Sequence, residues 1–342
     1  MTSPVPQAPA ASTASAAVEV AGSGLAELTC AWLLLARGHR VRLRSSGPAA
    51  GPRPLLLNEP TLNLLHSLWG LTPPADCHHL THRQVRWGPG AGPTGRRLPQ
   101  PALVVDGARL AEHLLGRLAA RYPDAFSEPS GPPRWTVTAA GPPGHWTAGR
   151  RHLLAGEAPL APGADETTAR LVCTELAWLH LTPLGGGRAL LQAMIPGPAT
   201  RPTELLERLL AGSALAPALR HAPETAVALP AAPRLHPAPV VPGRILVGAG
   251  AIRYDPLSGT GTAQALRTAI LAAASLHAMA RGAPHGPVST HYTTRLRTAF
   301  HAHLATCARL YPQAFTSPAW RHEADACRRR APLLRGDGDR DR

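Results

Sequence analysis

The chain has 342 residues, a length typical of one large domain or of two closely associated domains. All 35 residues counted as Lys or Arg are Arg, against 21 Asp and Glu, so the formal net charge is +14. Because Lys is absent, phosphate-binding loops of the G-x-x-x-x-G-K type and Schiff-base or pyridoxal-phosphate chemistry are excluded.

The positive charge has two interpretations. A strongly basic chain can indicate a nucleic-acid partner, whose retention would fall steeply as salt rises. Here the arginines are scattered, with one short cluster at Arg328–Arg330, and Ala, Pro and Gly are abundant while Asn is rare. This composition is typical of a protein from a GC-rich genome, which accounts for the positive charge. We therefore expect no nucleic-acid partner.

The ends of the chain carry no targeting or membrane signal. Residues 1–16 lack the basic start and apolar stretch of a secretion signal, and no run of about 18 apolar residues indicates a membrane span. We expect flexible tails over residues 1–16 and 328–342. Five widely spaced cysteines disfavour a disulfide framework, which predicts a cytoplasmic location.

The first predicted elements form a nucleotide-binding β-α-β unit. We predict a strand over residues 17–21, a glycine turn, a helix from residue 25 to 35 that stops at Gly38, and a strand over 41–43. A helix over 61–69 follows. The His-rich segment Cys77–His82 comes next and is predicted to be a surface loop.

The remaining elements alternate between short strands and helices. Strands are predicted over 84–87, 102–105 and 135–139, with a helix over 110–120. A hairpin over 171–182 and 188–194 turns at Gly185–Gly187. A helix over 203–210 precedes a strand over 244–247, which leads into long helices over 262–280 and 289–310.

Two glycine-rich segments lie between a predicted strand and a predicted helix. The first is Gly22-Ser23-Gly24-Leu25-Ala26-Glu27, and the second is VGAGAIRYDPLSGTG over residues 247–261. Glycines in such turns allow close approach of a ligand, and a helix N-terminus offers unpaired backbone N–H groups to an anion. Both segments therefore predict contacts with an anionic or polar ligand.

Together and in this order, the two segments resemble both ends of the FAD-binding domain of flavoprotein monooxygenases and flavin-dependent halogenases. In that family a G-x-G-x-x-G turn binds the ADP half of FAD, and a late G-D-A-x-x-x-x-D-P-x-x-G-x-G segment follows the ribityl chain and isoalloxazine ring. The residues that match, and that the resemblance implies as FAD contacts, are Gly22, Gly24, Gly248, Asp255, Pro256, Gly259 and Gly261.

Three further segments extend the resemblance. Residues 178–183 are similar to the tryptophan-bearing strand of the family's substrate sheet, residues 139–141 to its A-T-G strand end, and residues 318–321 to its C-terminal segment. Within the superfamily, the chain most resembles the branch that hydroxylates a protein tryptophan during maturation of quinone-cofactor oxidases.

The resemblance implies an α/β fold in which a discontinuous FAD-type Rossmann domain holds an inserted β-rich substrate domain. The Rossmann part is expected over residues 17–83, 107–150 and 240–283, and the substrate sheet over 84–106 and 151–239. A C-terminal helical segment is expected over 284–327.

The implied function is that of an FAD-dependent oxidoreductase, a monooxygenase that transfers oxygen through a flavin hydroperoxide to a small aromatic or protein-borne substrate. The halogenase branch is excluded because its chemistry uses a Lys. Strand spacing places Trp178 and His180 on one face, where they either contact substrate or flavin or make ordinary sheet packing. No other catalytic residue is assigned.

Three departures from the family pattern support an alternative function. Glu27 replaces the third glycine, Ser45 stands where an acid is expected at the ribose, and Ala249 replaces the aspartate of G-D. Each lost acid removes a charged hydrogen bond of about 1.5–3 kcal/mol. Glu27 either repels a pyrophosphate or satisfies the helix N-terminus. The alternative is a catalytically degenerate binding or maturation partner that holds FAD weakly or not at all.

The segment Cys77–His82 contains residue types found in zinc sites, but no second ligand pair stands at a suitable spacing. We therefore predict no metal site. The substrate, the electron donor and the oligomeric state are not specified by the sequence.

Overall fold

The computed structural model describes residues 18–44, 54–71, 77–90, 92, 95–127 and 132–333. The predicted tail over 1–16, Ser45, and residues 334–342 of the predicted C-terminal tail lie outside this part. Residues 328–333 were also predicted to be a disordered tail, but they complete the last helix, α8 (Pro318–Leu333).

The first layer is a five-stranded sheet with the order β14-β15-β6-β1-β2. Four of its strands run parallel: β1 (Val18–Ala21), β2 (Val41–Arg44), β6 (Trp135–Thr138) and β15 (Arg244–Leu246). The short antiparallel strand β14 (Val240–Val241) forms one edge. Strands from distant parts of the chain therefore meet in one sheet, and their side chains at Val20, Val137 and Ile245 are fully buried.

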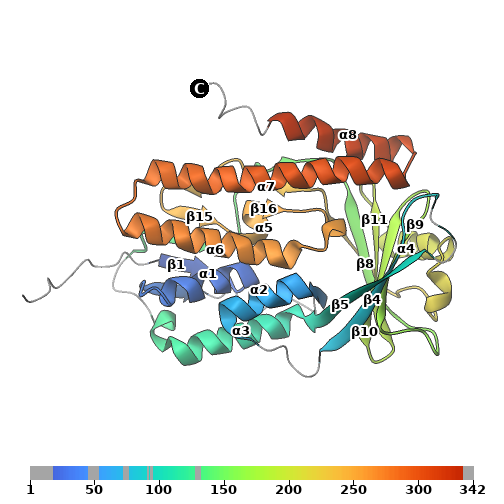
Figure 1. The fold of residues 1–342 in the computed structure, drawn as a ribbon, viewed down its shortest axis with the longest axis horizontal. Coiled ribbons are helices and arrows are strands. Elements are labelled where there is room, and N and C mark those ends of the chain that lie inside the picture. The colour runs from blue at the N-terminus through green and yellow to red at the C-terminus, as the bar shows by residue number, and fades with distance from the viewer. Residues whose placement is uncertain are drawn as a thin grey trace, which may run out of the picture.

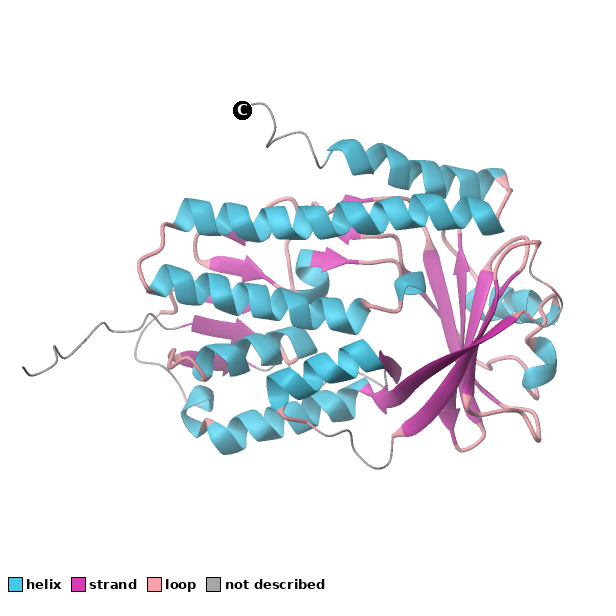
Figure 2. Ribbon diagram, viewed as in Figure 1, coloured by secondary structure: helices cyan, strands magenta, loops and turns pink. Residues whose placement is uncertain are grey.

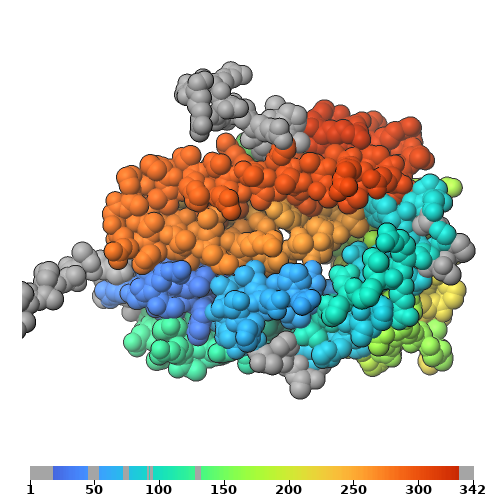
Figure 3. Space-filling model, viewed as in Figure 1, coloured from blue at the N-terminus to red at the C-terminus, as the bar shows by residue number. Residues whose placement is uncertain are grey.

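Helices cover this sheet in successive layers. Helix α1 (Leu25–Leu35) packs against α6 (Gly261–Ala280), and α7 (His285–Ala314) and α8 lie beyond α6, as Figure 1 shows. Figure 3 shows the two long orange helices side by side above the blue N-terminal segment. Both helices bury small side chains, which allows close packing; they include Ala26, Cys30, Ala31, Ala269, Ala272 and Ala273.

The second layer is an eight-stranded sheet with the order β12-β8-β11-β10-β9-β4-β5-β3. Figure 2 shows its magenta strands crossing one end of the molecule. The pairs are antiparallel except for β4 with β9. In sheet order the bounds are β12 (Val227–Pro230), β8 (His152–Pro159), β11 (Arg188–Ile195), β10 (Trp178–Gly185), β9 (Thr168–Cys173), β4 (His78–Arg86), β5 (Arg96–Asp106) and β3 (Pro54–Asn58).

Shorter elements complete the described part. Helix α4 (Pro202–Ala211) buries three leucines against the eight-stranded sheet, namely Leu206, Leu209 and Leu210. A three-stranded sheet joins β16, β13 and β7. The bounds are α2 (Glu59–Trp69), α3 (Gly107–Arg121), α5 (Gly248–Ala251), β7 (Trp146–Thr147), β13 (Arg234–Leu235) and β16 (Ile252–Arg253), with 3-10 turns at Pro123–Phe126, Ala216–Ala218 and Pro256–Ser258.

The α/β class, the β1-α1-β2 unit and the glycine turn of the hairpin are confirmed, but the single strand predicted over 171–182 is wrong, because it is divided between the antiparallel strands β9 and β10. Strands β10 and β11 turn at Gly185–Gly187, where all three glycines have positive φ angles. The loop predicted over Cys77–His82 is wrong, because His78–His82 belong to β4, which pairs with β5 on one side and β9 on the other. The division into domains stays a prediction, although β3 and the first half of β4, placed with the Rossmann part, pair in the eight-stranded sheet.

Most of α8 falls within the helical segment expected over 284–327, although no separate second helix was predicted there, and α7 extends beyond the predicted residues 289–310 at both ends. Within the described residues, no helix is long and apolar enough to cross a membrane.

Candidate functional site

Three glycine-containing strand ends converge at one edge of the five-stranded sheet. They follow β1 (residues 22–24), β6 (residues 139–141) and β15 (residues 248–250). A Cβ on Gly250 would collide with the Ala139 carbonyl, and one on Gly248 would lie 3.1 Å from the Ala26 Cβ. The close approach therefore depends on glycine. The edge is the carboxyl end of parallel strands, where open α/β sheets bind dinucleotides.

The carboxylate of Glu27 lies inside this crevice. Its side chain is 5 % exposed, and Oε1 accepts a hydrogen bond from the Ala139 N–H at 2.9 Å. A Cβ on Gly24 would lie 2.6 Å from Oε2, and one on Gly22 would lie 2.8 Å from Oε1. In this type of turn, the second glycine leaves room for the pyrophosphate. Glu27 fills that room.

The surroundings of Glu27 act on its pKa in opposite directions. Burial raises the pKa, while hydrogen bonds from its own backbone N–H and from that of Ala139 lower it, and burial dominates. Glu27 itself stands in the first turn of α1, where a helix favours negative charge. The hydrogen bond from Ala139 joins Glu27 to the end of β6, and both roles that the sequence left open for Glu27 stay predictions.

The late glycine segment adds no acidic group to the crevice. The Gly248 N–H donates to the Thr268 hydroxyl at 2.8 Å, so this donor is already used inside the protein. Ala249 is exposed, and its carbonyl accepts a hydrogen bond from Arg234 at 3.4 Å. The carboxylate that the family pattern places at this position has no counterpart among these residues. Ser45, the other predicted contact near the ribose, lies outside the described residues.

Asp255 lies in a buried network rather than at a free edge. Its Oδ2 is 2.9 Å from Arg151 Nε and accepts a hydrogen bond from the Tyr311 hydroxyl at 2.7 Å. Its Oδ1 accepts from the Leu257 N–H at 2.9 Å, and its own N–H donates to His303 Nε2 at 2.8 Å. Both carboxylate oxygens are thus occupied within the chain. Contact between this carboxylate and a cofactor stays a prediction.

Arg151 connects that network to the C-terminal helix. It is fully buried, and Nη1 lies 2.8 Å from Oε2 of Glu323 on α8. Burial alone lowers its pKa, but Asp255 is the largest of the opposing influences, and together they raise the pKa of Arg151 above its usual value. Burial also lowers the pKa of His303 to about 4, despite the opposing charge of Asp255.

The predicted substrate face meets the late glycine segment at a small cavity. Trp178 and His180 on β10 line it together with Pro256 and Gly259. Its volume is about 70 Å³. Cavities of about 150 Å³ hold benzene, and ligand pockets usually measure about 300–1,000 Å³. The structure therefore brings four predicted site residues together around a space too small for an aromatic ring.

Sequence reasoning missed two arginines near this site. Arg151 binds Asp255, and Arg83 on β4 lines the cavity beside His180. Each precedes or lies within a strand, where an arginine is ordinarily interpreted as solvent-exposed. Their positions become informative only when the strand pairings bring distant parts of the chain together.

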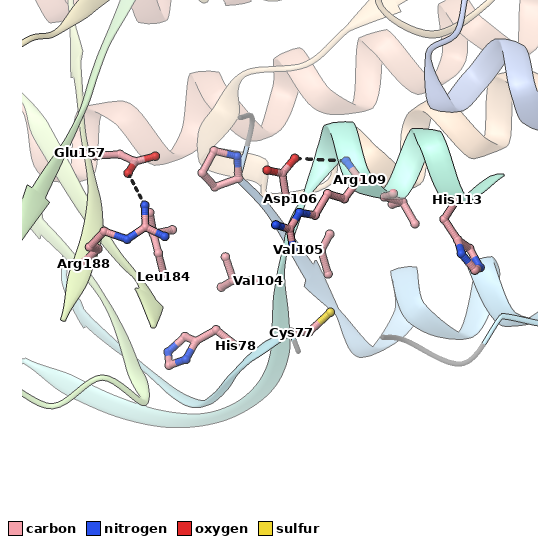
Figure 4. A pocket seen from close by; sticks show the side chains of 12 residues that line it. Cys77, His78, Val104, Val105, Asp106, Arg109, His113, Glu157, Leu184 and Arg188 are labelled. Atoms are coloured by element: carbon pink, nitrogen blue, oxygen red, sulfur yellow. Dashed lines mark hydrogen bonds and ion pairs between the residues drawn. The ribbon is translucent and has the colours of Figure 1, made fainter. Parts of the chain in front are cut away.

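A second hollow, of about 420 Å³, lies at the start of β4 (Figure 4). His78 contacts the Glu166 carbonyl at 2.6 Å, Arg188 pairs with Glu157 at 3.1 Å, and Asp106 caps helix α3. Arg188, Glu157 and Asp106 thus have protein partners. No group of three or more His, Cys, Asp or Glu among the described residues is arranged to hold a metal ion.

Comparison with known proteins identifies the class of fold. No family model and no curated protein sequence matches the chain. Solved structures do match, and the chain has the fold of the FAD-dependent monooxygenases and flavin-dependent halogenases.

Three particular structures illustrate the likeness. The peptidyl tryptophan dihydroxylase QhpG, essential for tryptophylquinone cofactor biogenesis, has a TM-score of 0.74 at 20% identity, over 91% of this chain and 79% of that one. The myxobacterial chondrochloren halogenase CndH has a TM-score of 0.73 at 16% identity, over 96% of this chain and 91% of the halogenase. PqsL from Pseudomonas aeruginosa has a TM-score of 0.68 at 16% identity, over 91% of this chain and 99% of PqsL. The predicted resemblance is confirmed at the level of the fold.

The residues of the crevice do not fit FAD in the arrangement described. The Glu27 carboxylate fills the space beside Gly24 and uses the Ala139 N–H. The cavity beside Pro256 is too small for a ring system. Binding of FAD would therefore require displacement of Glu27 and widening of that cavity.

Proposed function

We propose that this chain is a catalytically degenerate member of the flavin-monooxygenase fold that acts as a binding or maturation partner without resident FAD. The observation that carries this proposal is the Glu27 carboxylate in the crevice. The Glu27 carboxylate fills the space that the pyrophosphate of FAD would need.

The electrostatic cost of binding FAD beside Glu27 supports the proposal. Two negative charges about 4 Å apart repel by about 4 kcal/mol at an effective dielectric near 20. Since about 1.4 kcal/mol is tenfold in affinity, this repulsion weakens binding by roughly a thousandfold. The protein avoids the repulsion only by protonating Glu27 or moving its side chain.

The proposed partner is an aromatic small molecule or a protein that carries an aromatic side chain. This part of the proposal rests on the fold alone, because QhpG, which has a similar fold, is described as a peptidyl tryptophan dihydroxylase. A protein that keeps the fold but lacks the cofactor can still hold such a substrate for another enzyme.

Titration of the purified protein with FAD tests the proposal. We expect colourless wild-type protein and no quenching of flavin fluorescence at micromolar FAD. Glu27→Ala removes the carboxylate but keeps a small residue that dinucleotide-binding turns accept at this position. We expect Glu27→Ala to bind FAD at least tenfold more tightly than the wild type.

The matched control is Glu27→Gln, which removes the charge and keeps the volume. We expect its affinity for FAD to rise less than that of Glu27→Ala, because the amide of the substituted side chain still fills the space beside Gly24. Yellow wild-type protein with stoichiometric flavin would contradict the proposal.

The second candidate is an FAD-dependent monooxygenase that acts on an aromatic substrate. The observation that favours it is the meeting of Trp178 and His180 with Pro256 and Gly259 around one cavity. The oxygen transfer through a flavin hydroperoxide that the resemblance implies needs bound FAD. The same titration therefore decides between the candidates, and substrate-stimulated NADH or NADPH oxidation in FAD-loaded wild type would favour the second.

A further inference from the structure

The cavity between β4, β10 and the 256–259 loop contains a guanidinium group to which the described residues supply no counter-charge. Arg83 lines it, and its Nε is buried without a hydrogen-bond partner. No ion pair or hydrogen bond joins Arg83 to another of the described residues. Burial lowers its pKa, and no carboxylate opposes that effect.

The other polar groups around Arg83 are neutral. The cavity lining includes Asn58, Gln100, Gln192 and Ser258, whose amide and hydroxyl groups are able to donate hydrogen bonds. His180 also lines it, and burial and then the charge of Arg83 lower its pKa to about 4, so it is uncharged at neutral pH. The cavity therefore holds one positive charge and several neutral donors.

Arg83 is half-buried, and a charge that is partly removed from water is stabilised by a partner of opposite sign. Arg151, which is fully buried near the same site, has two carboxylate partners, at 2.9 Å and 2.8 Å. Arg83 differs from Arg151 because none of the described residues supplies a carboxylate partner for it. A planar guanidinium matches a carboxylate better than other anions, since both groups form paired hydrogen bonds.

We propose that this cavity is a carboxylate-binding subsite centred on Arg83. Its volume of about 70 Å³ corresponds to roughly two water molecules at about 30 Å³ each, so it admits a carboxylate group and leaves the remainder of the ligand outside. The ligand class is a small organic acid or a peptide carboxylate. The proposal goes beyond the proposed function, because it assigns a ligand class to the cavity of the FAD-free protein.

Calorimetric titration of FAD-free protein with acetate and benzoate tests the subsite, in buffer without chloride or phosphate. Acetamide and benzamide are the neutral controls. We expect both acids to bind and both amides to fail. Arg83→Met should weaken acid binding by tenfold or more, since a hydrogen bond to a charged group contributes at least that factor.

Arg86→Met is the matched variant, because Arg86 lies on the same strand but lines a different hollow, beside Val172 and Phe315. We expect it to bind acetate as the wild type does. Because Arg83→Met removes an uncompensated charge, it should fold and unfold at the wild-type temperature or above. If it does not fold, saturation-transfer NMR of acetate on the wild type, with benzoate as competitor, gives an independent test.

Four results would overturn the proposal: equal binding of acetate and acetamide, wild-type affinity in Arg83→Met, tighter binding of chloride or phosphate than of either acid, or failure of benzoate to displace acetate. A peptide that ends in a carboxylate and binds more tightly than acetate would identify the peptide source. Because no FAD is present, these outcomes are separate from those of the flavin titration.

Discussion

At the residue scale, the buried charges of this protein differ in how fully they are paired. Arg151 is enclosed by Asp255 and Glu323, and its guanidinium also lies over the Tyr311 ring at 5.0 Å. Among the described residues, Glu27 is compensated by backbone N–H groups rather than by a cation. Removing one member of a compensated group leaves its partner as an isolated buried charge, which is why single substitutions there are costly.

Arg151→Met should therefore destabilise the protein by about 3–5 kcal/mol, because the carboxylates of Asp255 and Glu323 lose their common cation. Urea unfolding followed by circular dichroism measures the change in the free energy of unfolding. Arg188→Met is the control, since the Arg188–Glu157 pair is largely exposed and contributes about 1 kcal/mol or less. Equal losses in the two variants would refute this account of Arg151.

At the element scale, α8 is held by an aromatic stack rather than by its own helix propensity. Trp320 stacks on Phe315 at 4.3 Å and on Tyr311 at 4.8 Å between ring centroids. Its indole N–H donates to the Leu176 carbonyl at 2.9 Å, which ties α8 to the turn between β9 and β10. Glu323, one turn further along α8, binds Arg151. These contacts fix α8 against both α7 and the large sheet.

Trp320→Ala should lower the free energy of unfolding by about 3–5 kcal/mol, since the ring is almost completely buried. Trp320→Phe keeps the stacking but loses the hydrogen bond to Leu176 and should cost about 1–2 kcal/mol. Thermal unfolding of both variants beside the wild type checks the order. The account of the stack would be wrong if Phe were as costly as Ala.

Elements with strong local patterns were the ones that the sequence predicted. The apolar spacing of α1 and α6 and the glycine turn of the β10–β11 hairpin are local signals. Strand β4 was missed at Cys77–His82 because its His and Thr residues indicate a loop, whereas its pairing with β5 and β9 is a tertiary effect. Helix α8 has a polar sequence and depends on contacts that no local pattern contains.

The same distinction applies to the candidate site. Glycine spacing indicated the crevice, and alternation along one strand placed Trp178 and His180 on one face. The sequence left the role of Glu27 open because only the folded chain brings the Ala139 N–H to its carboxylate. The roles of Arg83 and Arg151 depend on neighbours that lie far away in the chain, so local sequence patterns do not predict them.

At the scale of the whole molecule, buried histidines should make stability depend on pH. The pKa values of His180 and His303 are lowered to about 4, chiefly by burial. Between about pH 6.5 and pH 4 the unfolded chain binds more protons at these residues than the folded chain, so stability falls as the pH is lowered. Glu27, with its raised pKa, acts in the opposite direction, and Asp165, lowered to about 2, matters only below that window.

We expect the free energy of unfolding to decrease by 1 kcal/mol or more between pH 6.5 and pH 4.5, as a lowered histidine pKa requires. Urea unfolding at several pH values measures this slope. In His180→Gln the slope should be shallower, because the substituted residue no longer titrates. A slope unchanged by the substitution would show that His180 does not contribute.

The five-stranded sheet also has a consequence for synthesis on the ribosome. Strand β1 and helix α1 are made early, but β15 and α6, which complete their sheet and cover the apolar face of α1, follow more than two hundred residues later. At about 5–20 residues per second, this interval is roughly ten to fifty seconds. During this interval the apolar face of α1 in the nascent chain is not covered by α6. We therefore expect chaperones to bind the N-terminal segment until α6 has been synthesised.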